Sequence, residues 1–169
     1  MTRALFIGRF QPIHKAHLEV IKKILKENDK IVIAIGSSQE SNTKENPFSA
    51  EERKGMIDAV MKSNKIKNYE TAEIPDFFDD EKWCGYIQEN IKGIDAAYSG
   101  NNVVLNCLKS RGFSVKKIKL IDDLNSTKIR EKIAKGTDWQ KDVPKEIAGF
   151  LVKINGIERI RNLYSKHGA

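Results

Sequence analysis

The sequence predicts an α/β fold, in which an open parallel sheet of about five strands carries helices on both faces and more helices follow at the C-terminus. Two observations support this prediction. Short apolar runs rich in β-branched residues alternate with segments of helical periodicity along the 169 residues. Most of these runs stop at or next to Gly or Pro, as buried strands do. An alternation of this kind is typical of a parallel sheet.

The first half of the chain is expected to supply three strands and two helices. The strands are expected at Arg3–Ile7, Lys30–Ile35 and Tyr69–Ile74, and the helices at Lys15–Glu27 and after Ser49. Ser49 and Glu52 fit a capping box, because a Ser at the N-cap and a Glu three residues later satisfy each other's backbone N–H groups. The polar stretch 37–48 breaks both periodicities and is expected to be a loop.

The second half continues the alternation and then becomes helical. Helices are expected at Asp80–Ile91, Val103–Lys109, Ser126–Ala134, Ile147–Ile154 and Ile157–Tyr164, and strands at Asp95–Ser99 and Val115–Ile121. Open sheets of this class bind ligands beyond the carboxyl ends of their strands. The turns that follow the strands are therefore the expected functional segments.

Composition sets limits on the class of protein. The net charge of +7 comes from lysines scattered along the chain, which argues against a nucleic-acid-binding role. Cys84 and Cys107 are far apart in sequence and are expected to be free thiols of a reducing compartment. No apolar run reaches the length of a membrane span. We expect a cytoplasmic, single-domain protein over 1–169, with a helical appendage at about 143–169.

The most informative segment is Gly8–His17, which reads GRFQPIHKAH. It lies between an expected strand and an expected helix, so its backbone N–H groups are well placed for an anion. Gly8 allows close approach of a ligand, and Arg9 suits phosphate. His14 and His17, at i and i+3, share one helical face and can donate to phosphate oxygens, and either can be cationic at neutral pH.

A second expected anion site lies at Ser126, Thr127 and Arg130, at the N-terminus of a helix. Alone, this pattern is more typical of an ordinary helix cap with a solvated arginine. Paired with the Gly8–His17 turn, it indicates the other side of a phosphate clamp. Trp83 is a candidate for stacking on a heterocycle, although core packing is the more common role of a single Trp.

Five motifs together resemble the archaeal type of nicotinamide-nucleotide adenylyltransferase, within the nucleotidyltransferase superfamily that carries HxGH and SxTxxR signatures. They lie in the family's order at Gly8–His17, Asn46–Arg53, Tyr98–Asn101, Asn125–Arg130 and Ile154–Ile160. Three positions depart from the family pattern. Ile13 replaces a Phe, Ala16 replaces the Gly between the histidines, and Asn125 replaces the first Ser of the late motif.

The resemblance implies a Rossmann-like fold and adenylyl transfer from ATP to nicotinamide mononucleotide (NMN), giving NAD and pyrophosphate in NAD biosynthesis, with Mg²⁺ accompanying ATP and no metal site built from protein side chains. It implies His14, His17 and Arg130 as catalytic residues and a homohexamer. ATP or its phosphates are expected to contact Gly8, Arg9, Phe10, Gln11, Ser126, Thr127 and Arg130. The nicotinamide nucleotide is expected to contact Trp83, Gly100 and Asn101.

Two alternatives remain open on the sequence. The first is another transferase of the superfamily, acting on pantetheine phosphate, FMN or an alcohol phosphate. The second is a non-catalytic nucleotide-binding protein. The acceptor pocket, expected around Pro75–Trp83 and Tyr98–Asn101, distinguishes the transferases from one another.

Overall fold

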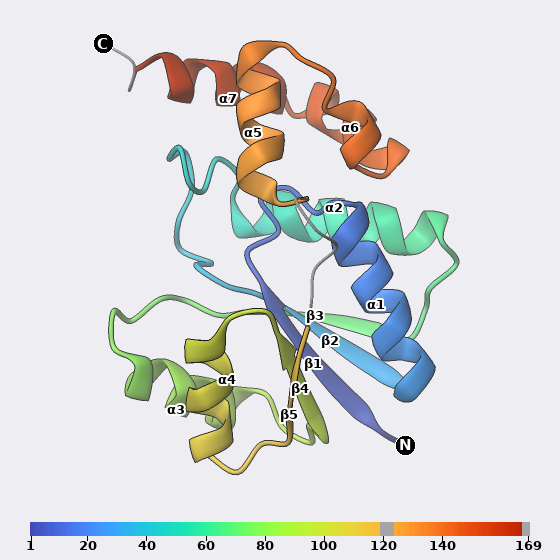
Figure 1. Cartoon of the computed structure of the whole chain (residues 1–169), viewed down its shortest axis with the longest axis vertical. Coiled ribbons are helices and arrows are strands. Elements are labelled where there is room, and N and C mark those ends of the chain that lie inside the picture. The colour runs from blue at the N-terminus through green and yellow to red at the C-terminus, as the bar shows by residue number, and fades with distance from the viewer. Residues whose placement is uncertain (119–123, 167–169) are drawn as a thin grey trace. The chain divides into compact units, whose positions relative to one another are not determined.

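The computed structural model describes residues 1–118 and 124–166 (Figure 1). The chain forms two compact units, each assembled from separate stretches of sequence. Among the described residues, unit 1 holds 1–8, 19–38 and 68–118, and unit 2 holds 9–18, 39–67 and 124–166.

Unit 1 contains a five-stranded parallel sheet, as predicted. Its strands are β1 (Arg3–Gly8), β2 (Lys30–Ile35), β3 (Tyr69–Glu73), β4 (Ala96–Ser99) and β5 (Val115–Lys117). They lie in the order β3-β2-β1-β4-β5, so the strand order reverses at the central strand β1. Of the predicted strand at 115–121, the last residues, 119–121, lie outside the described residues.

Helices cover both faces of this sheet (Figure 1). The helices α3 (Asp80–Asn90) and α4 (Asn102–Ser110) lie against one face, and the part of α1 (Lys15–Glu27) that belongs to unit 1 covers the other. Leu5, Val32 and Ala97 are paired across the strands and form one buried core with side chains of α3 and α4. On the other face, the Tyr98 hydroxyl accepts a hydrogen bond from Asn28 at 3.0 Å.

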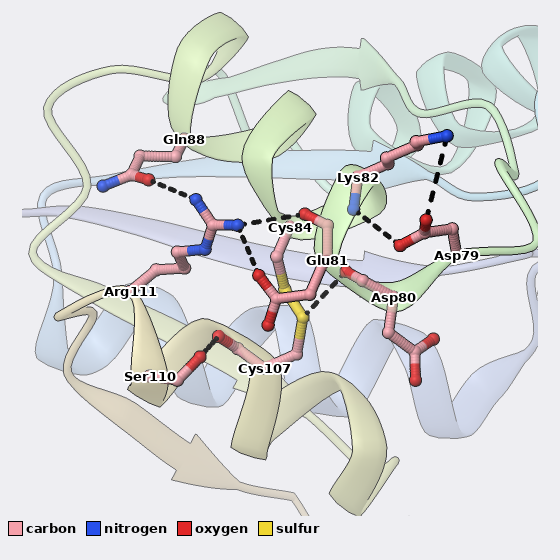
Figure 2. Close-up of a disulfide and its surroundings, with 9 residues drawn as sticks. All are labelled: Asp79, Asp80, Glu81, Lys82, Cys84, Gln88, Cys107, Ser110 and Arg111. Atoms are coloured by element: carbon pink, nitrogen blue, oxygen red, sulfur yellow. Dashed lines mark hydrogen bonds and ion pairs between the residues drawn. A yellow bond between two sulfur atoms is a disulfide. The ribbon is translucent and has the colours of Figure 1, made fainter.

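Unit 1 also contains a disulfide that the sequence analysis did not predict. Cys84 of α3 and Cys107 of α4 are bonded, with their Cα atoms 6.2 Å apart. Figure 2 shows the bond between the two helices, with Arg111, just after α4, reaching back to Glu81 of α3 at 2.6 Å. The expectation of two free thiols is wrong, because α3 and α4 pack side by side and bring distant cysteines together.

Unit 2 is helical in its regular structure. It contains α2 (Ala50–Ser63), α5 (Ser126–Lys135), α6 (Lys145–Lys153), α7 (Gly156–Ser165), a short 3-10 helix at Gln140–Asp142 and the first turn of α1. The expected capping box of Ser49 and Glu52 is present at the start of α2. The helix α7 packs on α5 and α6, and α6 packs on α2, so the C-terminal helices are part of unit 2. One domain over 1–169 stays a prediction.

Candidate functional site

The turn that follows β1 has an unusual backbone. Phe10 is fully buried and has a φ of 52°, in the left-handed region that a bulky residue rarely adopts. The bond between Gln11 and Pro12 is cis. Strained conformations of the Phe10 kind cluster at functional sites, where the surrounding structure holds them in place. The turn that the sequence singled out is therefore a constrained element.

Side chains of α2 and α5 hold three carbonyl groups of this turn. Arg53 Nη1 donates to the Arg9 carbonyl at 3.1 Å, and Arg130 Nη1 donates to the Gln11 carbonyl at 2.9 Å. Ser126 Oγ donates to the Pro12 carbonyl at 3.0 Å. A carbonyl oxygen carries partial negative charge and repels a phosphate. Because these three carbonyl groups accept hydrogen bonds from α2 or α5, their oxygens point toward those helices. The turn is thereby better suited to an anion.

The two histidines of the turn lie against each other. Their ring centroids are 3.7 Å apart, the planes are inclined by 26°, and both side chains are buried. The His14 backbone N–H donates to His17 Nδ1 at 3.3 Å, so in neutral His17 the ring proton lies on Nε2. His14 Nδ1 is buried without a hydrogen-bond partner among the described residues. An orphaned buried nitrogen of this kind is suited to pairing with a ligand.

Burial controls the charge of both histidines. Removal from water lowers the pKa of His14 to about 4, although the negative charge of Asp142 opposes this shift. Removal from water, and then the proximity of His14, lower the pKa of His17. Both imidazoles are therefore neutral at pH 7 in the nucleotide-free chain, whereas the sequence alone allowed either to be cationic. As neutral rings they still donate an N–H to an oxygen anion.

Arg130 is buried, and its donors contact the protein on three sides. Besides the Gln11 carbonyl, its Nε donates to the Lys44 carbonyl at 3.1 Å and its Nη2 donates to Thr127 Oγ1 at 3.3 Å. Burial lowers the pKa of its guanidinium. The structure thus brings Arg130 and Thr127 together and connects Arg130 to the turn. The N-cap of α5 is Asn125, whose side chain accepts from the Lys128 N–H at 2.9 Å.

Ala16 is fully buried in the first turn of α1. The helix nevertheless begins at Lys15, as predicted, and both flanking histidines are in place. The methyl group at this departure from the family pattern is therefore compatible with the paired imidazoles.

The Asn46–Arg53 block is joined to the turn by Gln11. The Gln11 side chain donates to the Phe48 carbonyl at 2.9 Å and accepts from the Phe48 N–H at 3.0 Å. Arg53 is fully buried, which the sequence analysis did not predict, although the residue lies on the same face of α2 as Met56, Ile57 and Val60. The reciprocal amide contact of Gln11 could not be predicted from the sequence either, because its partner Phe48 lies 37 positions away.

The remaining predicted site residues belong to unit 1. Gly8 ends β1 and its carbonyl accepts from the Gly36 N–H at 2.9 Å. Trp83 is half-buried and packs against the core cluster, so part of its side chain contributes to the core and part remains exposed. Asn101 caps α4 by accepting from the Val103 N–H at 2.9 Å. Gly100 is exposed, and a Cβ there would only reach ordinary contact with the Ile118 carbonyl at 3.7 Å.

Metal and membrane features are limited in the described part of the chain. Residues 1–118 and 124–166 contain no group of three or more His, Cys, Asp or Glu side chains placed to hold a metal ion. None of the helices among them has the length and hydropathy that a bilayer span requires.

The sequence matches a known family over most of its length. The family model described as cytidylyltransferase-like covers residues 5–162. The chain belongs to the cytidylyltransferase-like family. A curated relative from Thermoplasma acidophilum, named nicotinamide-nucleotide adenylyltransferase, is 40% identical over 163 residues, which are 95% of this chain and 91% of that protein. A relative of the same name from Methanococcus maripaludis is 40% identical over 166 residues, which are 97% of this chain and 96% of that protein.

Solved structures confirm the fold of this family member. A Francisella tularensis protein described as a bifunctional NMN adenylyltransferase/ADP ribose pyrophosphatase, complexed with AMP and a manganese ion, superposes with a TM-score of 0.84. The match covers 98% of this cytidylyltransferase-like chain and 52% of the Francisella chain, at 24% identity. A putative nicotinate-nucleotide adenylyltransferase from Vibrio parahaemolyticus gives a TM-score of 0.65, at 18% identity over 89% of this chain. Both show the predicted Rossmann-like architecture.

Proposed function

We propose that this chain is an adenylyltransferase that joins ATP and NMN to give NAD and pyrophosphate, in NAD biosynthesis. The observation that carries the proposal is 40% identity to curated nicotinamide-nucleotide adenylyltransferases along nearly the whole chain. The buried histidine pair and the constrained turn supply the chemistry that such a reaction needs.

The reaction is a displacement at phosphorus. An oxygen of the NMN 5′-phosphate attacks the α-phosphorus of ATP and forms the new P–O bond. The bond from that phosphorus to the oxygen bridging to the β-phosphorus breaks, and pyrophosphate leaves with this oxygen and its electron pair. No covalent intermediate with the protein is required, so catalysis depends on positioning and on stabilisation of charge.

His14 and His17 are the residues we assign to the transferred phosphoryl group. Their buried, neutral rings offer N–H donors in a site of low polarity, where a hydrogen bond to an oxygen anion is stronger than in water. A bound triphosphate would place negative charge beside them and raise the pKa of both rings. The proposal assigns Arg9, Phe10, Gln11, Ser126, Thr127 and Arg130 to the ATP phosphates, with Gly8 giving them room.

A divalent cation belongs to the substrate in this proposal. Mg²⁺ usually binds through phosphate oxygens and retained waters rather than a cage of protein ligands. Mg²⁺ would neutralise phosphate charge, and the side chains of the turn would orient the phosphates.

The acceptor is assigned to residues of unit 1. We propose that Trp83, Gly100 and Asn101 contact the nicotinamide nucleotide. Trp83 would do so with the part of its ring that the core leaves uncovered, since the side chain is half-buried. We further propose a cytoplasmic enzyme that assembles as a homohexamer, as the family resemblance implies. The cytoplasmic assignment no longer rests on free thiols, because Cys84 and Cys107 form a disulfide.

Release of pyrophosphate from ATP, Mg²⁺ and candidate acceptors tests the function. We expect release with NMN that exceeds release with pantetheine phosphate, FMN or an alcohol phosphate. Nicotinate mononucleotide is added as an alternative acceptor, and CTP is added as an alternative to ATP. Nucleotide binding without pyrophosphate release from any pair would instead identify a non-catalytic nucleotide-binding protein.

A further inference from the structure

The C-terminal segment Asn155–Arg159 belongs to a motif that the proposed function leaves without a role. Arg159 of α7 forms a bidentate ion pair with Glu52 of α2 through both terminal nitrogens of its guanidinium. Its Nη1 lies 2.6 Å from Oε2 and its Nη2 lies 2.8 Å from Oε1. The two side chains are 26% and 22% exposed, so the pair is largely shielded from solvent. A shielded bidentate pair of this kind fixes geometry as well as charge.

Arg159 holds a segment of unit 2 at two points. Glu52 also accepts from the Ser49 N–H at 2.9 Å, so it closes the capping box that begins α2. The same Nη1 of Arg159 donates to the Pro47 carbonyl at 3.1 Å. Burial opposes the ionisation of Glu52, but the hydrogen bonds from Arg159 and Ser49 outweigh it and lower its pKa. The loop before α2 is therefore fastened to α7.

Phe48 lies between these two fixed points and is fully buried. A Cβ built on Gly156 would lie 2.9 Å from Phe48 Cε1 and 3.1 Å from Leu151 Cδ2, so the first turn of α7 has no room for a methyl group. The Arg159 guanidinium carbon lies 5.8 Å from the centre of the Phe48 ring. The start of α7 thus fixes the position of Phe48.

The backbone of Phe48 is hydrogen-bonded to the turn. It exchanges two hydrogen bonds with the Gln11 side chain, at 2.9 and 3.0 Å. Gln11 is buried, and its own carbonyl accepts from Arg130. A continuous chain of contacts therefore leads from Arg159, through Phe48 and Gln11, to Arg130, and all of it lies within unit 2.

We propose that Arg159 is a positioning residue for adenylyl transfer, which acts through Glu52 and Phe48 to hold Gln11 and the phosphate-binding turn. This inference rests on the proposed function, since it assigns the turn to the ATP phosphates. Arg159 itself touches no substrate in this proposal.

Kinetics of Arg159→Gln test the role. We expect kcat/KM for MgATP to fall by about 10- to 100-fold, because a small misplacement of a reacting group costs that much, while the KM for NMN stays within about two-fold. Arg159→Lys keeps the positive charge but cannot form the bidentate pair, so its kcat/KM for MgATP should lie between the values of Arg159→Gln and the wild type. Arg161→Gln is the matched control on the same helix, because its partner Glu158 is exposed and 3.9 Å away. It should leave both constants unchanged.

Thermal unfolding separates positioning from simple stabilisation. All variants are compared well below their melting temperatures, with folding checked by circular dichroism. A lower Tm with wild-type kcat and KM values for Arg159→Gln would overturn the proposal. If Arg159→Gln does not fold, Glu52→Gln removes the same ion pair from the other side and must show the same loss toward MgATP.

Calorimetric titration with ATP distinguishes failure of this inference from failure of the proposed function. If wild-type protein binds ATP but forms no NAD, the proposed function fails, and weaker ATP binding by Arg159→Gln would still support the positioning role. If wild-type protein forms NAD, and Arg159→Gln binds and turns over ATP equally well, the positioning role alone fails.

Discussion

The stacked imidazoles of His14 and His17 are the two side chains whose chemistry is most sensitive to change. His17 is buried and its Nδ1 is engaged by the His14 backbone N–H, so its ring orientation is set before any nucleotide binds. We expect His17→Ala to lower kcat about 10²- to 10³-fold, the scale for loss of one preorganised group that stabilises charge. The measurement is steady-state NAD formation by protein that circular dichroism shows to be folded. Turnover at the wild-type rate would contradict the assigned role.

The same residues predict how stability depends on pH. The pKa of His14 falls from 6.5 to about 4 on folding, and that of His17 falls too, so the unfolded chain binds more protons between these values. The free energy of unfolding should therefore be retained above pH 7 and decrease as the pH falls from 6.5 toward 4. By pH 5, His14 alone should contribute a loss of about 2 kcal/mol.

Urea denaturation of the nucleotide-free protein at pH 7 and pH 5 measures this loss. His14→Asn is the comparison variant, since it removes one of the titrating rings, and its stability should depend less on pH over this range. Equal wild-type stability at the two pH values would show that the histidines titrate normally in the folded chain.

At the scale of elements, the pairing of α3 with α4 gives a testable contribution to stability. The disulfide between Cys84 and Cys107 spans 23 positions of sequence, and closing a loop of that size in the unfolded chain is worth roughly 3 kcal/mol. We expect a reducing agent to lower the Tm by about 10 °C. Differential scanning calorimetry with and without the reductant measures the shift.

A variant with both cysteines replaced by alanine should have a lower Tm that no longer responds to the reductant. Mass spectrometry of unreduced peptides provides an independent check, because it should find the peptides containing Cys84 and Cys107 joined. Two unlinked peptides, together with a Tm that ignores the reductant, would exclude the bond.

At the scale of the whole molecule, the residues assigned to the transferred phosphoryl group and those assigned to the nicotinamide nucleotide belong to different units of the chain. Trp83 lies in unit 1, whereas His14, His17 and Arg130 lie in unit 2. We expect Trp83→Ala to raise the KM for NMN about ten-fold through loss of stacking. Equilibrium binding of ATP, measured by calorimetric titration, should stay within about two-fold of wild type. A matching loss of ATP affinity would mean that Trp83 acts through the stability of the core.

Much of this architecture could be predicted from periodicity and caps. Lys15–Glu27 and Lys30–Ile35 have the predicted bounds, because an amphipathic helix and a β-branched apolar run leave little ambiguity. The capping box at Ser49 was equally clear, since its two partners are only three residues apart. These elements depend on interactions between residues that are close in sequence, so the local sequence is enough to predict them.

What could not be predicted depends on contacts between distant residues. The bond between Cys84 and Cys107 and the neutral state of His14 and His17 follow from packing and burial, which a single sequence does not report. The same holds for Arg159, whose motif was recognised but whose partner Glu52 lies 107 positions away. The charge and the connections of the candidate site residues therefore depend on packing, which the sequence does not report.

The discontinuous make-up of the two units has a consequence for how the chain can be divided experimentally. The polypeptide passes from one unit to the other five times, and each unit is assembled from three separate stretches. No single cut in the chain yields either unit alone, so neither unit can be prepared as one uninterrupted fragment of this sequence.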